Sequence, residues 1–452
     1  MILLALSLPL LSGVLWMRLL YPQPMPGRWP LILGFGYVLG MLAVPWLLRL
    51  QSLLGFGLSP EPSLFLFALS LLPPLWIGRR RETVPPVVPP APRSTWQRWL
   101  FILLFAWLLV RFANLALEVW WRPLFPWDAW TTWGVRAKVW TQLETLVPFV
   151  DPQHWMREAP EGTYALAAWQ YPLAPSLIAA WLPLATGAWN ETWANLPWLG
   201  CGLALALGYY GQARLWGIDA RIALIFTGML VSLPMLDTHI ALAGYGDLWM
   251  ATALGLGFSA FLHWIRDKKA RQGVLALLLI LGCLSLKREG LIWALLFLPA
   301  YWATRPRGFP MVLGLMALGL LSLAALYFLG EIRLQFPYLG QFSFSLQGEW
   351  AAVLQAFFVV DHWHLLAYSI PVLLLVGLRT LEPVQRAAWA WGISALFVLY
   401  VLFFWTQASQ WAAHPTSFNR LFLQIVPPLL FWGMISLPDG LRWKGHECDA
   451  SH

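Results

Sequence analysis

Charged residues are scarce in this chain. Of its 452 residues, 11% are Asp, Glu, Lys or Arg, whereas 59% are hydrophobic. An average soluble domain carries about 25% charged residues, so this chain has too few polar side chains to cover a water-exposed surface. The composition excludes a soluble globular protein and predicts an integral membrane protein.

Cysteine is equally sparse, with three residues in the whole chain. Cys201 and Cys283 lie within apolar runs, and Cys448 lies in the polar tail. This number and spacing exclude a disulfide framework and a CxxC metal site.

Apolar runs of membrane length are abundant. A spanning helix needs about 20 predominantly apolar residues, and thirteen runs approach that length. They are 2–20, 30–48, 62–78, 98–117, 193–213, 221–236, 248–265, 273–287, 290–304, 309–329, 363–378, 388–405 and 419–437. The run 2–20 lacks a basic segment before it, so we expect a retained helix rather than a signal peptide.

A further run, 164–187, is interrupted by Pro172, Pro175 and Pro183. We expect it to be re-entrant or juxtamembrane, because crossing there would move the later basic loops to the outside. The fold expected is therefore an all-α polytopic membrane protein with about 13 transmembrane helices. Amphipathic juxtamembrane helices are expected in the first long extracytoplasmic loop.

The net charge of +8 follows the topology. Arg79, Arg80 and Arg81 form the strongest cytoplasmic marker by the positive-inside rule. That assignment places most basic residues in cytoplasmic loops, so the charge is no argument for a nucleic-acid partner. It also places the long loops 118–163 and 330–362 outside, and long loops are where function is to be sought.

Tryptophan, unlike charged residues and cysteine, is abundant, with 32 residues. In the first long loop, Trp127, Trp130, Trp133 and Trp140 recur near helical spacing, which predicts an amphipathic helix in the membrane interface. Asp128 lies at the start of this helix. Its carboxylate is either an N-cap or a catalytic group beside indole rings that could stack on a sugar.

Other polar residues occur at the ends of the apolar runs. Asp237, His239 and Asp247 include metal-binding side-chain types, but their spacing matches no strong motif. Lys287 and Arg288 at a membrane boundary either snorkel to headgroups with Glu289 as partner or bind a phosphate.

Several short motifs occur in a particular order along the chain. They are Trp127-Asp128-Ala129-Trp130, Tyr171-Pro172 followed by Asn190-Glu191, Asp247, Lys287-Arg288-Glu289-Gly290, and Asn419-Arg420 with Pro427-Pro428. As a set, this pattern resembles the GT-C superfamily of polytopic glycosyltransferases, in the branch of protein O-mannosyltransferases and lipid A aminoarabinose transferases. The resemblance covers roughly residues 98–437.

The resemblance implies transfer of a sugar from a polyprenyl-phosphate-linked donor to a glycan, lipid or protein acceptor on the extracytoplasmic face. It implies that Asp128 is the general base, with Asp247 and His414 as second candidates for acid–base chemistry or acceptor positioning. Lys287, Arg288 and Arg420 would hold the donor phosphate, and Trp127, Trp130, Tyr171 and Glu191 would contact the sugar or acceptor.

The implied location is a bacterial inner membrane, with the active site facing outward. The first loop carries one Asp where the family often has an acidic pair of metal ligands. The cofactor is therefore unknown, and the sequence allows a divalent metal without requiring one. By sequence, residues 1–97 are additional helices and a Pro-rich cytoplasmic linker, 98–437 the catalytic module, and 438–452 a polar tail. With no soluble domain after the last span, we expect an acceptor met near the membrane.

Two other functional classes stay open. In a transporter or lipid flippase, Lys287, Arg288 and Arg420 would line a substrate path, although internal repeats are common in transporters and none is visible here. A non-catalytic scaffold or polysaccharide polymerase subunit would also use large outer loops rich in tryptophan.

Overall fold

The computed structural model describes residues 1–79, 95–158, 161–336, 340–346, 350–377, 381–411 and 416–437. These residues are predominantly helical, as expected for an all-α membrane protein. The chain divides into two compact units. One contains Met1–Val231 and Asp237–Thr252, and the other contains Ser232–Leu236 and the described residues of Ala253–Asp439.

The first unit consists mainly of helices, with one long connection of short elements between α5 and α8. Its elements are α1 (Ile2–Leu20), α2 (Arg28–Leu53), α3 (Pro60–Ser70), α4 (Leu72–Arg79), α5 (Thr95–Trp121), η1 (Ala129–Trp133), α6 (Gly134–Leu143), β1 (Phe149–Val150), α7 (Pro152–Glu158), β2 (Tyr164–Ala165), α8 (Ala174–Thr186), α9 (Glu191–Trp216) and α10 (Ala220–Val231). Helices α11 (Pro234–Ala241) and α12 (Gly246–Asp267) each contribute residues to both units.

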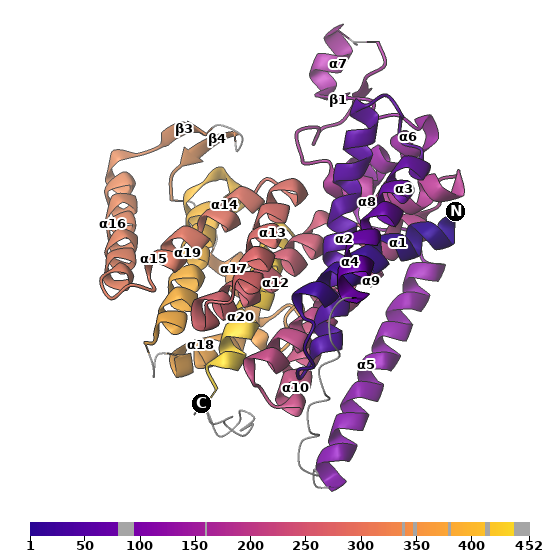
Figure 1. Cartoon of the computed structure of the whole chain (residues 1–452). Helices are drawn as coiled ribbons and strands as arrows, with labels where there is room; N and C mark the ends of the chain where they lie inside the picture. Colours follow the sequence, from indigo (N-terminus) through magenta and orange to yellow (C-terminus); the bar gives the residue numbers. More distant parts are fainter. Residues whose placement is uncertain are drawn as a thin grey trace. The chain divides into compact units, whose positions relative to one another are not determined.

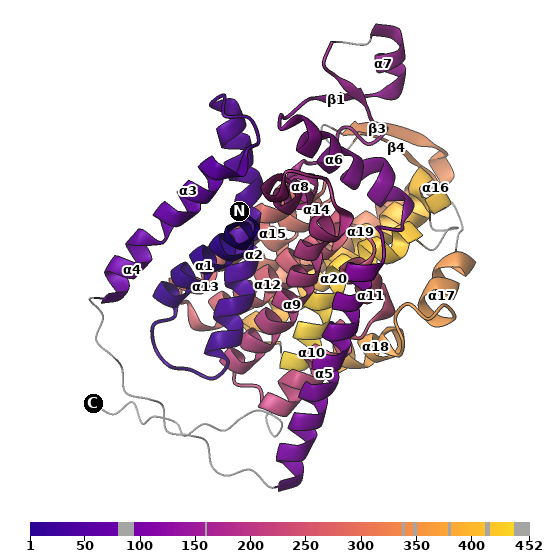
Figure 2. The same ribbon diagram turned by 90° about the vertical axis from the view of Figure 1, so that its right-hand side faces the viewer.

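Glycine allows the first unit to pack closely. A Cβ atom at Gly34 of α2 would lie 2.4 Å from the backbone nitrogen of Gly208 on α9, and one at Gly13 of α1 would lie 1.9 Å from the carbonyl oxygen of Gly36. Such small-residue contacts let helix backbones meet in a lipid environment. Helices α1, α2 and α9 are thereby joined, and α3 and α4 lie alongside α1 (Figure 2).

The second unit carries the later helices and a β-hairpin. Its elements are α13 (Ala270–Leu286), α14 (Gly290–Leu295), α15 (Phe297–Trp302), α16 (Gly308–Leu329), β3 (Ile332–Phe336), β4 (Gly340–Phe344), α17 (Trp350–Phe358), α18 (Leu366–Gly377), α19 (Pro383–Trp405), η2 (Gln407–Trp411) and α20 (Thr416–Ile435). Figure 1 shows the hairpin continuing from the end of α16.

Aromatic packing forms much of the core of this unit. The rings of Phe258 on α12, Phe297 on α15 and Trp391 on α19 contact one another, with Phe258 and Trp391 centroids 4.9 Å apart. Pro427 of α20 packs against Gly255 of α12, where a Cβ atom would lie 2.5 Å away. Helices α12 and α20 are accordingly almost entirely buried.

Among the described residues, eight helices are long and apolar enough to cross a membrane, or nine if the pair α10–α11, bent by 69°, is one span. The expected count of thirteen is not confirmed. Residues 273–287, 290–304 and 363–378 form helices that are too short, and α9 has the length but a more polar composition. Helix α8, in the proline-interrupted run, has 13 residues. It rises by only about 20 Å, less than the roughly 30 Å hydrocarbon core.

Candidate functional site

Asp128 lies at the start of a π-helical turn. Residues 129–133 form η1, and the N–H of Gly134 closes the turn by donating to the carbonyl oxygen of Ala129. A Cβ atom at residue 134 would lie 2.5 Å from that oxygen, so glycine permits this contact. Asp128 occupies the N-cap position, but its carboxylate accepts no capping hydrogen bond from η1. Short π-helical turns are frequent at functional sites.

The tryptophans of this helix divide into two pairs. Trp127 and Trp130 are 78% and 55% exposed, whereas Trp133 and Trp140 are buried. The four tryptophans therefore do not all point into the interior of the protein. The wider π turn inserts an extra residue and rotates the later positions into the protein. Asp128 is half-buried, and its neighbours in sequence Trp127 and Trp130 are exposed.

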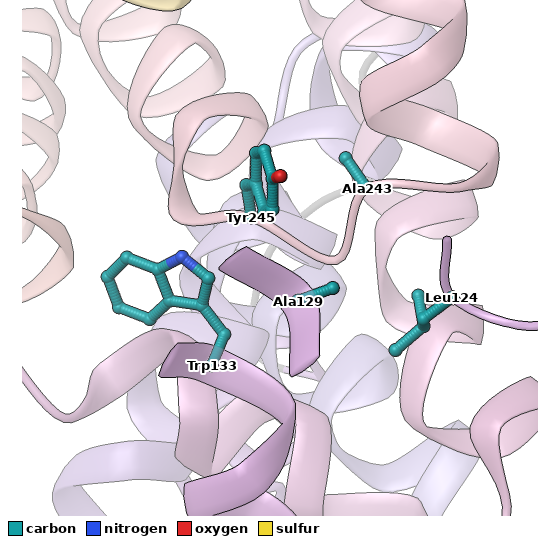
Figure 3. Close-up of a cluster of buried hydrophobic side chains, with 5 residues drawn as sticks. All are labelled: Leu124, Ala129, Trp133, Ala243 and Tyr245. Atoms are coloured by element: carbon teal, nitrogen blue, oxygen red, sulfur yellow. The ribbon is translucent and has the colours of Figure 1, made fainter. Parts of the chain in front are cut away.

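The buried side of the turn joins three segments of the first unit. Ala129 and Trp133 pack with Leu124 and with Ala243 and Tyr245 of the loop before α12 (Figure 3). Tyr171 is also packed against this cluster, its ring centroid 5.4 Å from that of Trp133. The segments that contain Asp128, Tyr171 and Asp247 are therefore neighbours.

Glu191 joins a fourth segment to this site. It lies in the first turn of α9, where the side chain of Asn190 caps the helix by accepting from the backbone N–H of Trp193. The Glu191 carboxylate accepts the backbone N–H of Leu124 at 3.0 Å. Its contact is thus with the loop that leads to Asp128, and its predicted role toward a sugar or acceptor stays a prediction.

Arg136 is a residue of this site that sequence reasoning missed. It is fully buried, and its guanidinium donates to the carbonyl oxygens of Ala168, Trp169 and Tyr171 at 2.7, 2.6 and 2.9 Å. Burial lowers its pKa to about 10. It fixes the loop that presents Tyr171. The sequence signal was a cation on the same helical face as Trp133 and Trp140, where a buried charge needs partners.

Asp247 and His239 are both buried in the first unit. Asp247 lies in the first turn of α12, where a carboxylate suits the helix dipole. The His239 ring centroid is 5.7 Å from that of Tyr245, whose carbonyl oxygen accepts the indole N–H of Trp198 at 2.6 Å. Within the part of the chain that the structure describes, no three His, Cys, Asp or Glu side chains form a group that could hold a metal ion.

The predicted phosphate-binding residues belong to the second unit. The Lys287 ammonium is buried and lies 2.7 Å from the Glu289 carboxylate. Glu289 accepts from the side-chain amide of Gln424 at 3.1 Å, and the other amide atom of Gln424 accepts the indole N–H of Trp293 at 2.6 Å. This chain of contacts connects the Lys287–Gly290 segment to α20.

Arg420 precedes Gln424 by one helical turn on α20, and Arg288 follows Lys287 directly. Both arginines are half-buried. The neighbouring Asn419 accepts the indole N–H of Trp363 at 3.0 Å, which positions the start of α20. His414, the remaining predicted site residue, lies outside the described residues.

No protein-family model, curated protein or solved structure matches this chain. The relation to the GT-C superfamily therefore stays a prediction, carried by the motifs of the sequence.

The two groups of residues belong to different units and differ in their chemistry. A carboxylate at a helix start beside exposed indole rings can accept a proton from a bound hydroxyl or amine. A lysine paired with a carboxylate and two arginines can bind a phosphate, arginine in a bidentate manner and lysine as a point charge.

Proposed function

We propose that this protein is a membrane glycosyltransferase of the GT-C type. It would move a sugar from a polyprenyl-phosphate-linked donor to a glycan, lipid or protein acceptor on the extracytoplasmic face of a bacterial inner membrane. The observation that carries the proposal is the position of Asp128, half-buried at the start of a π turn, in a segment where the neighbouring Trp127 and Trp130 are exposed.

The exposed indoles support a carbohydrate ligand. Trp127 and Trp130 present flat apolar faces, and the C–H groups of a pyranose ring pack against such faces. The indole N–H of Trp130 donates to the carbonyl oxygen of Leu124 at 2.5 Å, which fixes the orientation of that ring. Trp127 and Trp130 thus offer two exposed stacking surfaces near Asp128 in the sequence, and that of Trp130 is held by a hydrogen bond.

The basic residues of the second unit support a phosphorylated donor. Lys287 is buried with Glu289, and burying a cation is costly unless it is paired. Lys287 and Arg288 lie just before the start of α14, and Arg420 lies in the first turns of α20. These three cations could bind the phosphate of the donor.

In the proposed mechanism, Asp128 accepts the proton of the acceptor hydroxyl or amine as that group attacks the anomeric carbon. The bond between the anomeric carbon and the phosphate oxygen breaks, and polyprenyl phosphate leaves with the electron pair. Lys287, Arg288 and Arg420 would stabilise the negative charge on the leaving phosphate. A single displacement of this kind inverts the anomeric configuration. Asp247 and His414 are second candidates for the acid–base role.

One observation favours the alternative of a lipid or polysaccharide transporter. Arg111 forms an ion pair with Asp237 in the middle of the membrane-length helix α5. Ionisable residues at membrane depth often mark substrate or ion pathways.

The test is transfer by the purified chain in nanodiscs, measured with a panel of polyprenyl-phosphate sugars. Asp128→Asn should lower turnover by about 100-fold or more, the contribution of general base catalysis, while insertion and thermal stability stay unchanged. Asp151→Asn is the matched control, because Asp151 lies in the same loop and its carboxylate caps the first turn of α7 by accepting from the backbone N–H of Gln153. Lys287→Met and Arg420→Gln should raise the KM for the donor.

Near-normal turnover of the Asp128→Asn variant would contradict the assignment of the base. Movement of labelled donor between leaflets without any transfer, abolished by Arg111→Gln, would favour the transporter.

A further inference from the structure

The hairpin β3–β4 has two chemically opposite faces. In its antiparallel register Ile332 pairs with Phe344, Leu334 with Phe342 and Phe336 with Gly340, and paired residues project to the same face. That face carries only apolar side chains and one glycine. The opposite face carries Arg333, Gln335, Gln341 and Ser343.

The apolar face is open. Leu334 and Phe336 are 46% and 37% exposed, and the rings of Phe336, Phe342 and Phe344 gather there with centroids 5.9–6.4 Å apart. An isolated two-stranded hairpin is marginal in water, and an uncovered aromatic face lowers its stability further. This hairpin therefore needs a partner for its apolar face.

The orientation of the hairpin is held from its second strand. The N–H of Ser345 donates to the carbonyl oxygen of Trp405 at 3.0 Å, and the N–H of Ser343 donates to the side chain of Gln407 at 2.7 Å. The Gln407 amide in turn donates to the carbonyl oxygen of Gln341 at 2.9 Å. These bonds join β4 and the residue after it to the start of η2 and to the end of α19, a helix of membrane length.

The hairpin begins where a lipid-exposed helix ends. Helix α16 is long and apolar enough to span a membrane and is almost entirely exposed within the chain. Its last residues are Tyr327, Phe328 and Leu329, of which Phe328 is 84% exposed, and β3 starts three residues later. Trp350 at the start of α17 and Trp411 at the end of η2 are exposed too, as is typical of aromatic residues at a membrane surface.

We propose that the apolar face of hairpin β3–β4 is seated in the lipid bilayer, at the boundary between headgroups and acyl chains, and anchors the second unit there. The hairpin follows α16 within three residues of the chain, and an exposed apolar helix of this length requires a bilayer around it. The polar face, with Arg333 paired to Glu331 at 2.9 Å, then faces water.

The test uses spin labels on neighbouring residues of opposite faces, in the full chain in nanodiscs. Leu334→Cys and Phe336→Cys place labels on the apolar face, and Gln335→Cys is the matched control on the polar face. Cys201 and Cys283 are buried and stay in place, whereas Cys448 is changed to Ser. Collision rates are measured with oxygen, which concentrates in the bilayer, and with a water-soluble nickel chelate.

The ratio of oxygen to nickel collisions should be several-fold higher at residues 334 and 336 than at residue 335. Equal ratios on the two faces would overturn the proposal. Labels at 334 shielded from both reagents would show that another protein segment covers the face, and dipolar coupling between labels would show a second copy of the chain. Either result would also overturn it.

Discussion

The guanidinium of Arg111, near the middle of α5, is paired with the carboxylate of Asp237 on α11. The same guanidinium donates from Nε to the carbonyl oxygen of Val231, the last residue of α10, at 2.9 Å. One arginine thus binds the residues on both sides of the bend between α10 and α11. Because α5 is otherwise almost entirely exposed, the contacts of Arg111 help to hold this helix against α10 and α11.

We expect Arg111→Leu and Asp237→Leu each to destabilise the protein by about 3 kcal/mol, because each leaves a charge without its partner in an apolar environment. The double variant should be destabilised by less than the sum of the two. Thermal unfolding in detergent measures this, with Arg98→Leu as a control that removes an exposed cation from the same helix. Additive effects in the double variant would contradict a direct pair.

The π turn at Asp128 depends on the absence of a side chain at Gly134. We expect Gly134→Ala to cost about 1–3 kcal/mol, because the new methyl group would meet a backbone oxygen that cannot move cheaply. Transfer activity should fall with it, since Asp128 sits on the same turn. Gly314→Ala on α16 is the matched control, because that position has open space. An equal response of the two variants in thermal unfolding and turnover would argue against the π turn.

A third prediction concerns pH and lies in the turn between α9 and α10. Partial burial alone would raise the pKa of Asp219, but hydrogen bonds and charge from Arg221 outweigh it and hold that pKa below the usual Asp value. The ion pair therefore stabilises the folded state at neutral pH. Its contribution is lost as the pH falls below the unfolded Asp pKa of about 3.9 and through the lower folded value.

Asp219→Asn should accordingly lower the thermal unfolding temperature at pH 7, and its difference from the unchanged chain should shrink towards pH 3. Arg221→Leu should show the same loss at pH 7 and the same convergence in acid. A difference that stays constant over this range would contradict a lowered folded pKa.

The long apolar helices were predictable because length and apolarity suffice to identify a span. Helices α1, α2, α5 and α16 coincide closely with the apolar runs of the sequence. The overestimate of spans has a physical cause: a short apolar helix buried among others, such as α13 or the pair α14–α15, has the composition of a span without its length. Hydropathy alone does not separate the two.

The local surroundings of Asp128 were less predictable. A π turn adds one residue to a helix and leaves no pattern of its own, so the separation of Trp130 from Trp133 could not be read from spacing. The hairpin was not predicted, because an all-α fold was expected, although Ile332, Leu334 and Phe336 alternate with Arg333 and Gln335 in the period typical of a strand. Glu289 was expected as the partner of Lys287 in one of the two alternatives that the sequence left open, but as part of snorkelling to lipid headgroups, whereas the paired Lys287 is buried.

The glycine contact between α2 and α9 also constrains how the protein is made. Gly34 and its partner Gly208 are separated by much of the first unit. At about 5–20 residues per second, a ribosome needs roughly 10–35 s to synthesise the chain between them. During that interval α2 has been synthesised, but α9, which packs against Gly34, has not. The packing of α1 and α2 therefore stays incomplete until α9 has been synthesised.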